Sequence, residues 1–151
     1  MRRCGPDEVL FLRQAVLRPH QRADEVRFPG DDGPDTFHFC VPDQDGQPIG
    51  VVSLMRQMPS WRPQAVDAWQ FRGMATGPHW RGRGVGRALV DALVDHVASG
   101  GGGLLWCNAR LTAVGFYERA GMVTTGEAWE EPVIGPHIAM FVQVLPGHVG
   151  S

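Results

Sequence analysis

The spacing of apolar residues divides the chain into segments of helical and of strand-like period. Apolar side chains recur every three or four residues from Val85 to Val97, so we expect a helix over residues 84–98. Residues 69–76 before this helix and residues 104–106 after it are apolar runs that favour buried strands. A strand, a helix and a second strand in this order predict a right-handed crossover between two parallel strands.

Antiparallel strands are predicted towards both ends of the chain. Residues 36–41 are rich in aromatic and β-branched side chains, and an Asp-Gly turn separates them from residues 48–54, which is typical of a hairpin. Residues 122–129 and 138–145 predict two closing strands, joined by a loop that contains Gly135-Pro136-His137.

Two further helices and one long polar stretch complete the pattern. We expect a helix over residues 9–17, after a short first strand, and another over residues 112–120, where Gly121 closes it. Residues 18–35 are polar and include the run Pro-Gly-Asp-Asp-Gly-Pro, which predicts a solvated loop. A loop that borders a binding site is the alternative.

The composition indicates one soluble globular domain over residues 1–151. Of these residues 43% are hydrophobic and 20% are charged, which is ordinary for such a domain. The net charge of −2 argues against a general nucleic-acid binder, and we expect neither a nucleic-acid nor a membrane partner. The first residues lack the apolar run of a secretory signal, which predicts a cytoplasmic protein. Three cysteines and six histidines show no metal-ligand or disulfide-framework spacing.

A turn rich in arginine and glycine lies between the predicted strand 69–76 and the predicted long helix. Residues 81–86 read Arg-Gly-Arg-Gly-Val-Gly. Glycines let successive backbone N–H groups point into one concavity at the positive end of the helix dipole, and this arrangement binds phosphate. Arg81, Arg83 and Arg87 add positive charge around the same anion. A turn whose glycines only allow close packing is the alternative.

Two motifs make the chain resemble the GCN5-related N-acetyltransferase (GNAT) superfamily over nearly its whole length. The first is Gln/Arg-x-x-Gly-x-Gly/Ala, which is matched by Arg81, Gly84 and Gly86, with Gly82, Arg83 and Val85 between them. The second is an Ala-x-x-x-Tyr helix followed by glycine and an apolar residue, matched by Ala113, Tyr117, Gly121 and Met122. The resemblance implies an α+β, three-layer fold. Its mixed, mostly antiparallel sheet would have six to seven strands, a central parallel strand pair that splays apart, and flanking helices.

The resemblance also implies acetyl-CoA as the cosubstrate, with no metal ion. The amides of the turn would hold its pyrophosphate, and the strand before the turn would lie along its pantetheine arm. Where the family often has an asparagine this chain has Arg110, and Asn108 is expected to reach the cofactor instead. The expected cofactor-binding residues are Met74, Ala75, Thr76, Arg81, Gly82, Arg83, Gly84, Val85, Gly86, Arg87, Asn108, Arg110 and Tyr117.

For catalysis, the resemblance assigns an acid and leaves the base unassigned. Tyr117, the only tyrosine, matches the general acid of the family, which protonates the departing thiolate; a packed aromatic ring is the alternative. The usual glutamate base is replaced by Gln70. A chain of ordered water or His137 are candidates for the base. Glu130 and Glu131 are candidates for an ammonium-binding rim, and His38 and Asp67 are weaker candidates for chemistry.

We therefore expect an N-acetyltransferase. It would transfer the acetyl group of acetyl-CoA to a primary amine of a small molecule, or to an exposed peptide amino group, by direct attack on the thioester. Because Gln70 replaces the usual base, a non-catalytic acyl-CoA-binding sensor or interaction module is the alternative. The acceptor amine is not identified by these motifs, and a homodimer is an expectation by analogy with similar folds.

Overall fold

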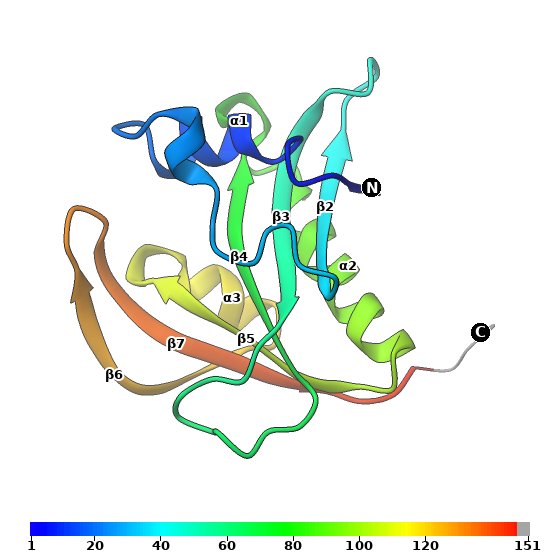
Figure 1. Cartoon of the computed structure of the whole chain (residues 1–151), viewed down its shortest axis with the longest axis vertical. Helices are drawn as coiled ribbons and strands as arrows, with labels where there is room; N and C mark the ends of the chain where they lie inside the picture. The colour runs from blue at the N-terminus through cyan, green and yellow to red at the C-terminus, as the bar shows by residue number, and fades with distance from the viewer. Residues whose placement is uncertain (148–151) are drawn as a thin grey trace. The chain divides into compact units, whose positions relative to one another are not determined.

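The computed structural model of the chain describes residues 1–147 (Figure 1). These residues fall into two compact units. The first unit comprises Met1–Met55 and Phe71–Leu93, and the second comprises Arg56–Gln70 and the chain from Val94 onwards. No helix among the described residues is long and apolar enough to cross a membrane.

The strands form one mixed sheet in the order β1-β2-β3-β4-β5-β7-β6. The pairing of β4 with β5 is parallel and the rest of the sheet is antiparallel, so the predicted α+β fold with a mostly antiparallel, seven-stranded sheet is confirmed. The strands are β1 (Arg2–Cys4), β2 (Thr36–Pro42), β3 (Pro48–Arg56), β4 (Ala68–Thr76), β5 (Gly103–Arg110), β6 (Val123–Glu131) and β7 (Gly135–Val144).

The first unit is built on the predicted hairpin and on the start of the long helix. Strands β2 and β3 pair antiparallel, with Phe39 opposite Val52, and β1 adds a third strand beside β2. The core on one side contains Val9, Leu12, Cys40, Val51 and Ala75. The helical segments are α1 (Leu10–Leu12), η1 (Arg13–Leu17), η2 (Ala23–Val26), η3 (Pro78–Trp80) and the start of α2 (Val85–Ser99).

The helix predicted over residues 9–17 divides into two parts. Residues Leu10–Leu12 are α-helical, and Arg13–Leu17 form a wider π-helical turn. Such turns interrupt helices where a side chain needs an unusual position. Here the change begins at Arg13, whose side chain is completely buried.

The second unit is built on β5 and the long closing hairpin. Strand β5 pairs antiparallel with β7 over its whole length, and β6 pairs with the other edge of β7. The parallel pairing of β4 with β5 covers three residue pairs, from Ala68 opposite Leu104 to Gln70 opposite Trp106. The helix predicted over residues 112–120 is a 3-10 turn, η4 (Leu111–Ala113), followed by α3 (Val114–Arg119). Gly121 ends it with φ +99°, as a glycine at a helix carboxyl end does.

The predicted loop between the closing strands is shorter than expected. His137 lies inside β7, paired with Arg110 of β5 and with Trp129 of β6, so its placement in a loop was wrong. Pro136 suggested a break, but it is opposite Glu130 and one residue beyond the last β5 pair. Its missing N–H therefore removes no bond to β5, and the strand continues through it.

Candidate functional site

The arginine- and glycine-rich turn has the backbone conformation that its glycines allow. Gly82 and Gly84 have φ of +76° and +82°, in the left-handed region that other residues avoid. A Cβ atom at either position would meet nothing within 4 Å, so packing does not require a glycine there. Arg81 and Arg83 in this turn and Arg87 just after it are all exposed.

The long helix begins directly after this turn. Helix α2 begins at Val85, and the first N–H that finds a helical partner is that of Ala88, which donates to the Gly84 carbonyl over 3.0 Å. The backbone N–H groups of Val85 and Gly86 precede this bond in the first helical turn, where N–H groups point towards the helix N-terminus. Val85 itself is buried and anchors the turn to the unit. The turn and helix together offer what a diphosphate needs, and the residues fit the predicted coenzyme.

The strand segment that precedes the turn has buried and half-buried side chains. The side chain of Ala75 is buried in the core beside Val51, whereas Met74 and Thr76 are half-buried. Gly73, two residues before Ala75, has φ +66° and interrupts the regular alternation of the strand. The three predicted residues Met74, Ala75 and Thr76 therefore lie on one short extended segment that leads to the turn.

Tyr117 lies in α3 of the second unit and is 8% exposed. Its ring meets Phe116 edge-on, with 5.2 Å between the ring centroids. Burial raises the pKa of Tyr117 well above its usual range; Cys107 adds to this increase and Arg110 opposes it. The phenol therefore keeps its proton at neutral pH, as a general acid must.

Asn108 and Arg110 project from β5 on the same face of the sheet, because they are two residues apart in the strand. Asn108 is exposed and Arg110 is half-buried, while Ala109 between them is buried. Arg110 is directly opposite His137 of β7.

His137 is 8% exposed and stacks on Trp129, with 6.0 Å between the ring centroids. Its Nδ1 lies 2.8 Å from the carbonyl oxygen of Gly135. Because a carbonyl only accepts, Nδ1 carries the hydrogen, and in the neutral ring Nε2 holds a lone pair. The tautomer needed for accepting a proton at Nε2 is thus the one that this contact selects.

The other candidates for chemistry have structural partners. Glu131 accepts a hydrogen bond from Trp129 Nε1 over 2.9 Å, and Glu130 is exposed on the same strand. Asp67 forms an exposed ion pair with Arg56 at 3.3 Å. His38 is buried, with Nδ1 2.6 Å from Ser53 Oγ.

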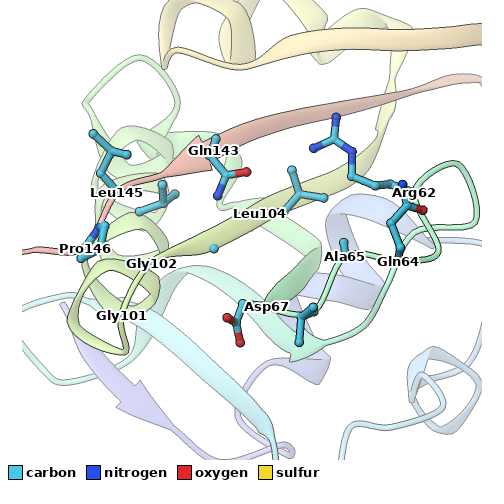
Figure 2. Close-up of a pocket in the computed structure, with 13 residues that line it drawn as sticks. Arg62, Gln64, Ala65, Asp67, Gly101, Gly102, Leu104, Gln143, Leu145 and Pro146 are labelled. Carbon is cyan, nitrogen blue, oxygen red and sulfur yellow. The ribbon is translucent and has the colours of Figure 1, made fainter.

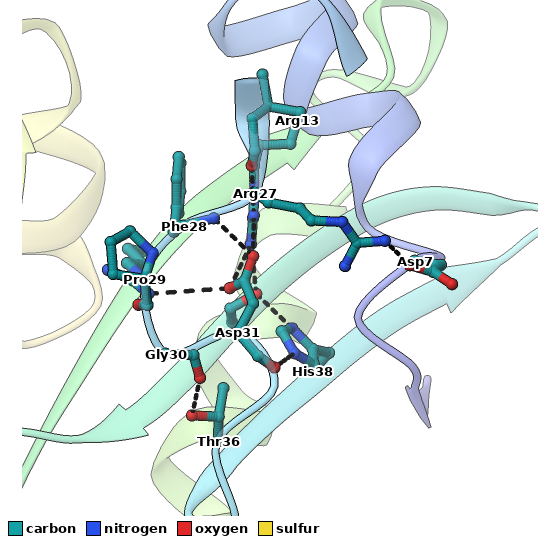
Figure 3. Close-up of polar contacts among 12 residues, drawn as sticks. Asp7, Arg13, Arg27, Phe28, Pro29, Gly30, Asp31, Thr36 and His38 are labelled. Atoms are coloured by element: carbon teal, nitrogen blue, oxygen red, sulfur yellow. Dashed lines mark hydrogen bonds and ion pairs between the residues drawn. The ribbon is translucent and has the colours of Figure 1, made fainter. Parts of the chain in front are cut away.

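A buried polar network in the first unit was not predicted (Figure 3). The fully buried Arg13 donates to Asp31 over 2.7 Å and to Ser53 over 2.8 Å, and His38 Nε2 lies 2.9 Å from the Asp31 carbonyl oxygen. Asp31 is 5% exposed, so the expectation of a solvated loop was wrong for this residue. The one signal in the sequence was an arginine within the apolar segment 9–17.

A pocket of about 480 Å³ lies in the second unit at the start of β5 (Figure 2). It is lined by residues 62, 64–67, 101–104 and 143–146. Asn108 and Arg110 are at the opposite end of β5 and do not line it; of the candidate residues only Asp67 does. Among residues 1–147, no group of three or more His, Cys, Asp or Glu side chains is placed to hold a metal ion.

Comparison with known proteins identifies the family. The model of the acetyltransferase (GNAT) family matches residues 8–122. A Bacillus subtilis (strain 168) protein called the uncharacterized N-acetyltransferase YitI is 33% identical over 135 residues, which are 89% of each chain.

Solved structures agree with this result. A Lactobacillus plantarum protein provisionally named an N-acetyltransferase superimposes with a TM-score of 0.74 at 27% identity, covering 93% of this chain and 91% of that one. An aminoglycoside 6′-N-acetyltransferase complexed with coenzyme A has a TM-score of 0.64 at 18% identity, covering 94% and 92%, and shows the same fold. The chain therefore belongs to the acetyltransferase (GNAT) family and is an N-acetyltransferase.

Proposed function

We propose that this enzyme transfers the acetyl group of acetyl-CoA to a primary amine of a small molecule or of an exposed peptide. The observation that carries the proposal is the turn at the start of α2. Its two left-handed glycines leave open space, and three arginines in the turn and just after it are exposed. A diphosphate is the ligand that such a turn suits best.

The amides of residues 82–86 would bind the diphosphate, with Arg81, Arg83 and Arg87 neutralising its charge. The pantetheine arm would then extend along Thr76, Ala75 and Met74, hydrogen-bonded to the strand backbone. The short parallel pairing of β4 with β5 supports this role, because β4 continues for six residues beyond Gln70, its last residue paired with β5. Asn108 and Arg110 are proposed as further contacts to the coenzyme.

In the proposed reaction the amine nitrogen attacks the carbonyl carbon of the thioester, the bond from carbon to sulfur breaks, and the thiolate leaves. Tyr117, whose buried phenol is protonated at neutral pH, would give its proton to that thiolate. The ammonium proton must leave before the attack, and the nitrogen loses a second proton as the amide forms, which balances the proton that Tyr117 gives to the thiolate. We propose His137 Nε2 or ordered water as its acceptor, since Gln70 carries no carboxylate.

Calorimetric titration with acetyl-CoA tests the first half of this proposal. We expect the wild-type chain to bind, and Arg83→Glu to lose binding because a carboxylate would face the diphosphate. Arg3→Glu, which makes the same charge change at an exposed residue of β1, is the matched control. Absence of binding in the wild-type protein, or equal affinity in a folded Arg83→Glu variant, would refute the assigned phosphate site.

Release of coenzyme A from acetyl-CoA over a broad amine panel tests the second half. We expect Tyr117→Phe to lower turnover by about 10²-fold or more while the affinity for acetyl-CoA is kept. Equal turnover would remove Tyr117 from the acid role. Replacement of the usual glutamate by Gln70 favours a second candidate function, an acyl-CoA sensor, which would bind acetyl-CoA and release no thiol with any amine.

A further inference from the structure

A cluster of arginines surrounds one aromatic ring in the first unit. The guanidinium carbons of Arg13, Arg72 and Arg18 lie 4.0, 5.0 and 5.9 Å from the centre of the Phe28 ring. Cations are attracted to the face of such a ring, most strongly where water is excluded. The ring holds the guanidinium groups together but supplies no negative charge.

One carboxylate serves two of these cations. Asp31 binds Arg13 through both oxygens, at 2.7 and 3.4 Å, and also accepts the backbone N–H of Phe28 over 2.8 Å. Arg72 is farther away, with Nη2 3.9 Å from Asp31 Oδ1. The group formed by Arg13, Arg72 and Asp31 therefore has a net charge of +1.

Three other acids of this region form ion pairs with other arginines. Asp7 pairs with Arg27, and Asp24 and Glu25 both pair with Arg22. Among the ion pairs of residues 1–147, none brings a second carboxylate to Arg72. The positive charge of Arg72 is thus only partly balanced.

Arg72 also has hydrogen-bonding capacity to spare. Its Nη2 donates to the carbonyl of Pro29, and within the described part of the chain its Nε and Nη1 donate to no acceptor. The side chain is 24% exposed, so a ligand can reach it in a partly desolvated setting. Burial, together with repulsion from Arg13, lowers the pKa of Arg72, although Asp31 opposes the shift.

A second observation points to the same stretch of β4. Arg13 is completely buried, and its Nε has no hydrogen-bond partner. A Cβ atom on Gly73, the residue after Arg72, would lie 2.9 Å from this Nε. The absence of a side chain at Gly73 lets a buried cation approach the strand backbone next to Arg72.

The position of Arg72 relates this charge to the reaction. In the proposed function the diphosphate binds at residues 82–86 and the pantetheine arm runs back along Thr76 to Met74. The acyl end of acetyl-CoA therefore lies towards Gly73 and Arg72. A cation there would repel an acceptor that carries only positive charge and would attract one that also carries an anion.

We propose that the acceptor is an amine that also bears a carboxylate, as an amino acid or a peptide with a free carboxyl end does, and that Arg72 binds this carboxylate. The inference rests on the proposed function. It names a substrate class that carries a carboxylate, unlike the aminoglycosides named for the coenzyme A-bound structural neighbour.

The test compares L-amino acids with their C-terminal amides as acceptors, with coenzyme A release as the readout. The amides keep the side chain and remove only the carboxylate. Because the amide lowers the pKa of the amine, it leaves more of the amine neutral, so a preference for the acid cannot arise from amine ionisation. We expect kcat/KM to be about tenfold or more higher for the acids, the effect of one charge-assisted contact.

Variants test whether Arg72 causes the preference for acids over amides. Arg72→Gln should abolish it through a raised KM for the acids while the affinity for acetyl-CoA, measured by calorimetry, is unchanged; Arg72→Lys should restore part of it. Arg27→Gln, an exposed arginine of the same unit, should keep the full preference. Amides that react as well as acids, or a preference that survives in Arg72→Gln, would overturn the inference.

Two further outcomes separate this inference from the proposed function. Failure to bind acetyl-CoA overturns the proposed function and this inference with it. If acetyl-CoA binds and no acceptor reacts, the inference is tested by titrating the coenzyme A complex with the same acids and amides. Acids that bind to wild type and not to Arg72→Gln support the inference, and acids that bind no better than amides overturn it.

Discussion

At the scale of single residues, the ion pair of Arg13 with Asp31 has a structural role rather than a chemical one. Both side chains are almost completely buried, and each has several hydrogen bonds to the other and to its surroundings. Taking two charges out of water costs free energy, and the attraction between the two side chains offsets this cost only while both are present. The segment 26–31 is thereby attached to η1 and β3 of the same unit.

We predict that Asp31→Asn lowers the free energy of unfolding by about 3 kcal/mol, because Arg13 would remain buried without a counter-charge. Asp24→Asn, whose side chain is 74% exposed, should change it by less than about 0.5 kcal/mol. Urea denaturation of the two variants measures the difference. Similar midpoints for both would mean that the Arg13 charge is compensated in another way.

Tyr117 gives a prediction on pH, because it is the only tyrosine of the chain. Burial raises the pKa of its phenol, so the unfolded chain releases this proton first as the pH rises. Stability should therefore fall above about pH 10, and Tyr117→Phe should remove that part of the loss. The near-ultraviolet absorbance of phenolate reports this single group, and phenolate that forms at the ordinary pKa in folded protein would contradict the assignment.

At the scale of elements, the glycines before β5 set how this strand enters the sheet of the second unit. Gly101 and Gly102 have φ of +106° and +84°. A Cβ atom on Gly102 would lie 2.7 Å from the carbonyl oxygen of Val144, whereas at Gly101 it would meet nothing within 4 Å. A side chain at either position would thus strain the backbone, and the two positions differ in the space around them.

We predict that Gly101→Ala costs about 1 kcal/mol of stability, the typical penalty for a left-handed alanine. Gly102→Ala should cost clearly more, since the end of β7 must also move away. Thermal or urea denaturation of the pair gives both values under the same conditions. Equal losses would show that the carbonyl of Val144 moves away without cost.

At the scale of the whole molecule, the family match over residues 8–122 includes parts of both compact units. This supports the proposal that residues 1–151 act as one acetyltransferase domain. The residues proposed for the diphosphate lie in the first unit, and Tyr117, Asn108 and Arg110 lie in the second.

A ligand that binds only the native protein must stabilise it against unfolding. At a concentration of 100 times its Kd, acetyl-CoA should add about 2.7 kcal/mol and raise the Tm by roughly 5 °C or more. We expect no shift for Arg83→Glu and the full shift for Arg3→Glu. Differential scanning fluorimetry measures this, and a shift retained by Arg83→Glu would place the anion site elsewhere.

The elements that could be predicted are those whose cause is local. Helix α2, the hairpin of β2 and β3, and β4 follow from apolar periodicity and an Asp-Gly turn. The left-handed backbone at Gly82 and Gly84 follows from the one residue type that adopts it freely. His137 was misplaced because Gly135-Pro136 reads as a turn, while pairing with strands on both sides keeps the segment extended.

The sequence by itself determined the family, the order of strands and helices and the left-handed glycine turn before α2, because these depend on neighbours within a few residues. Only the tertiary structure decided which charges are buried. Arg13 and Asp31 are 18 residues apart, and whether an arginine is solvated or paired depends on what packs around it. For the same reason only the structure shows that Arg72, one of fourteen arginines in composition, retains unbalanced positive charge beside the strand proposed for the cosubstrate.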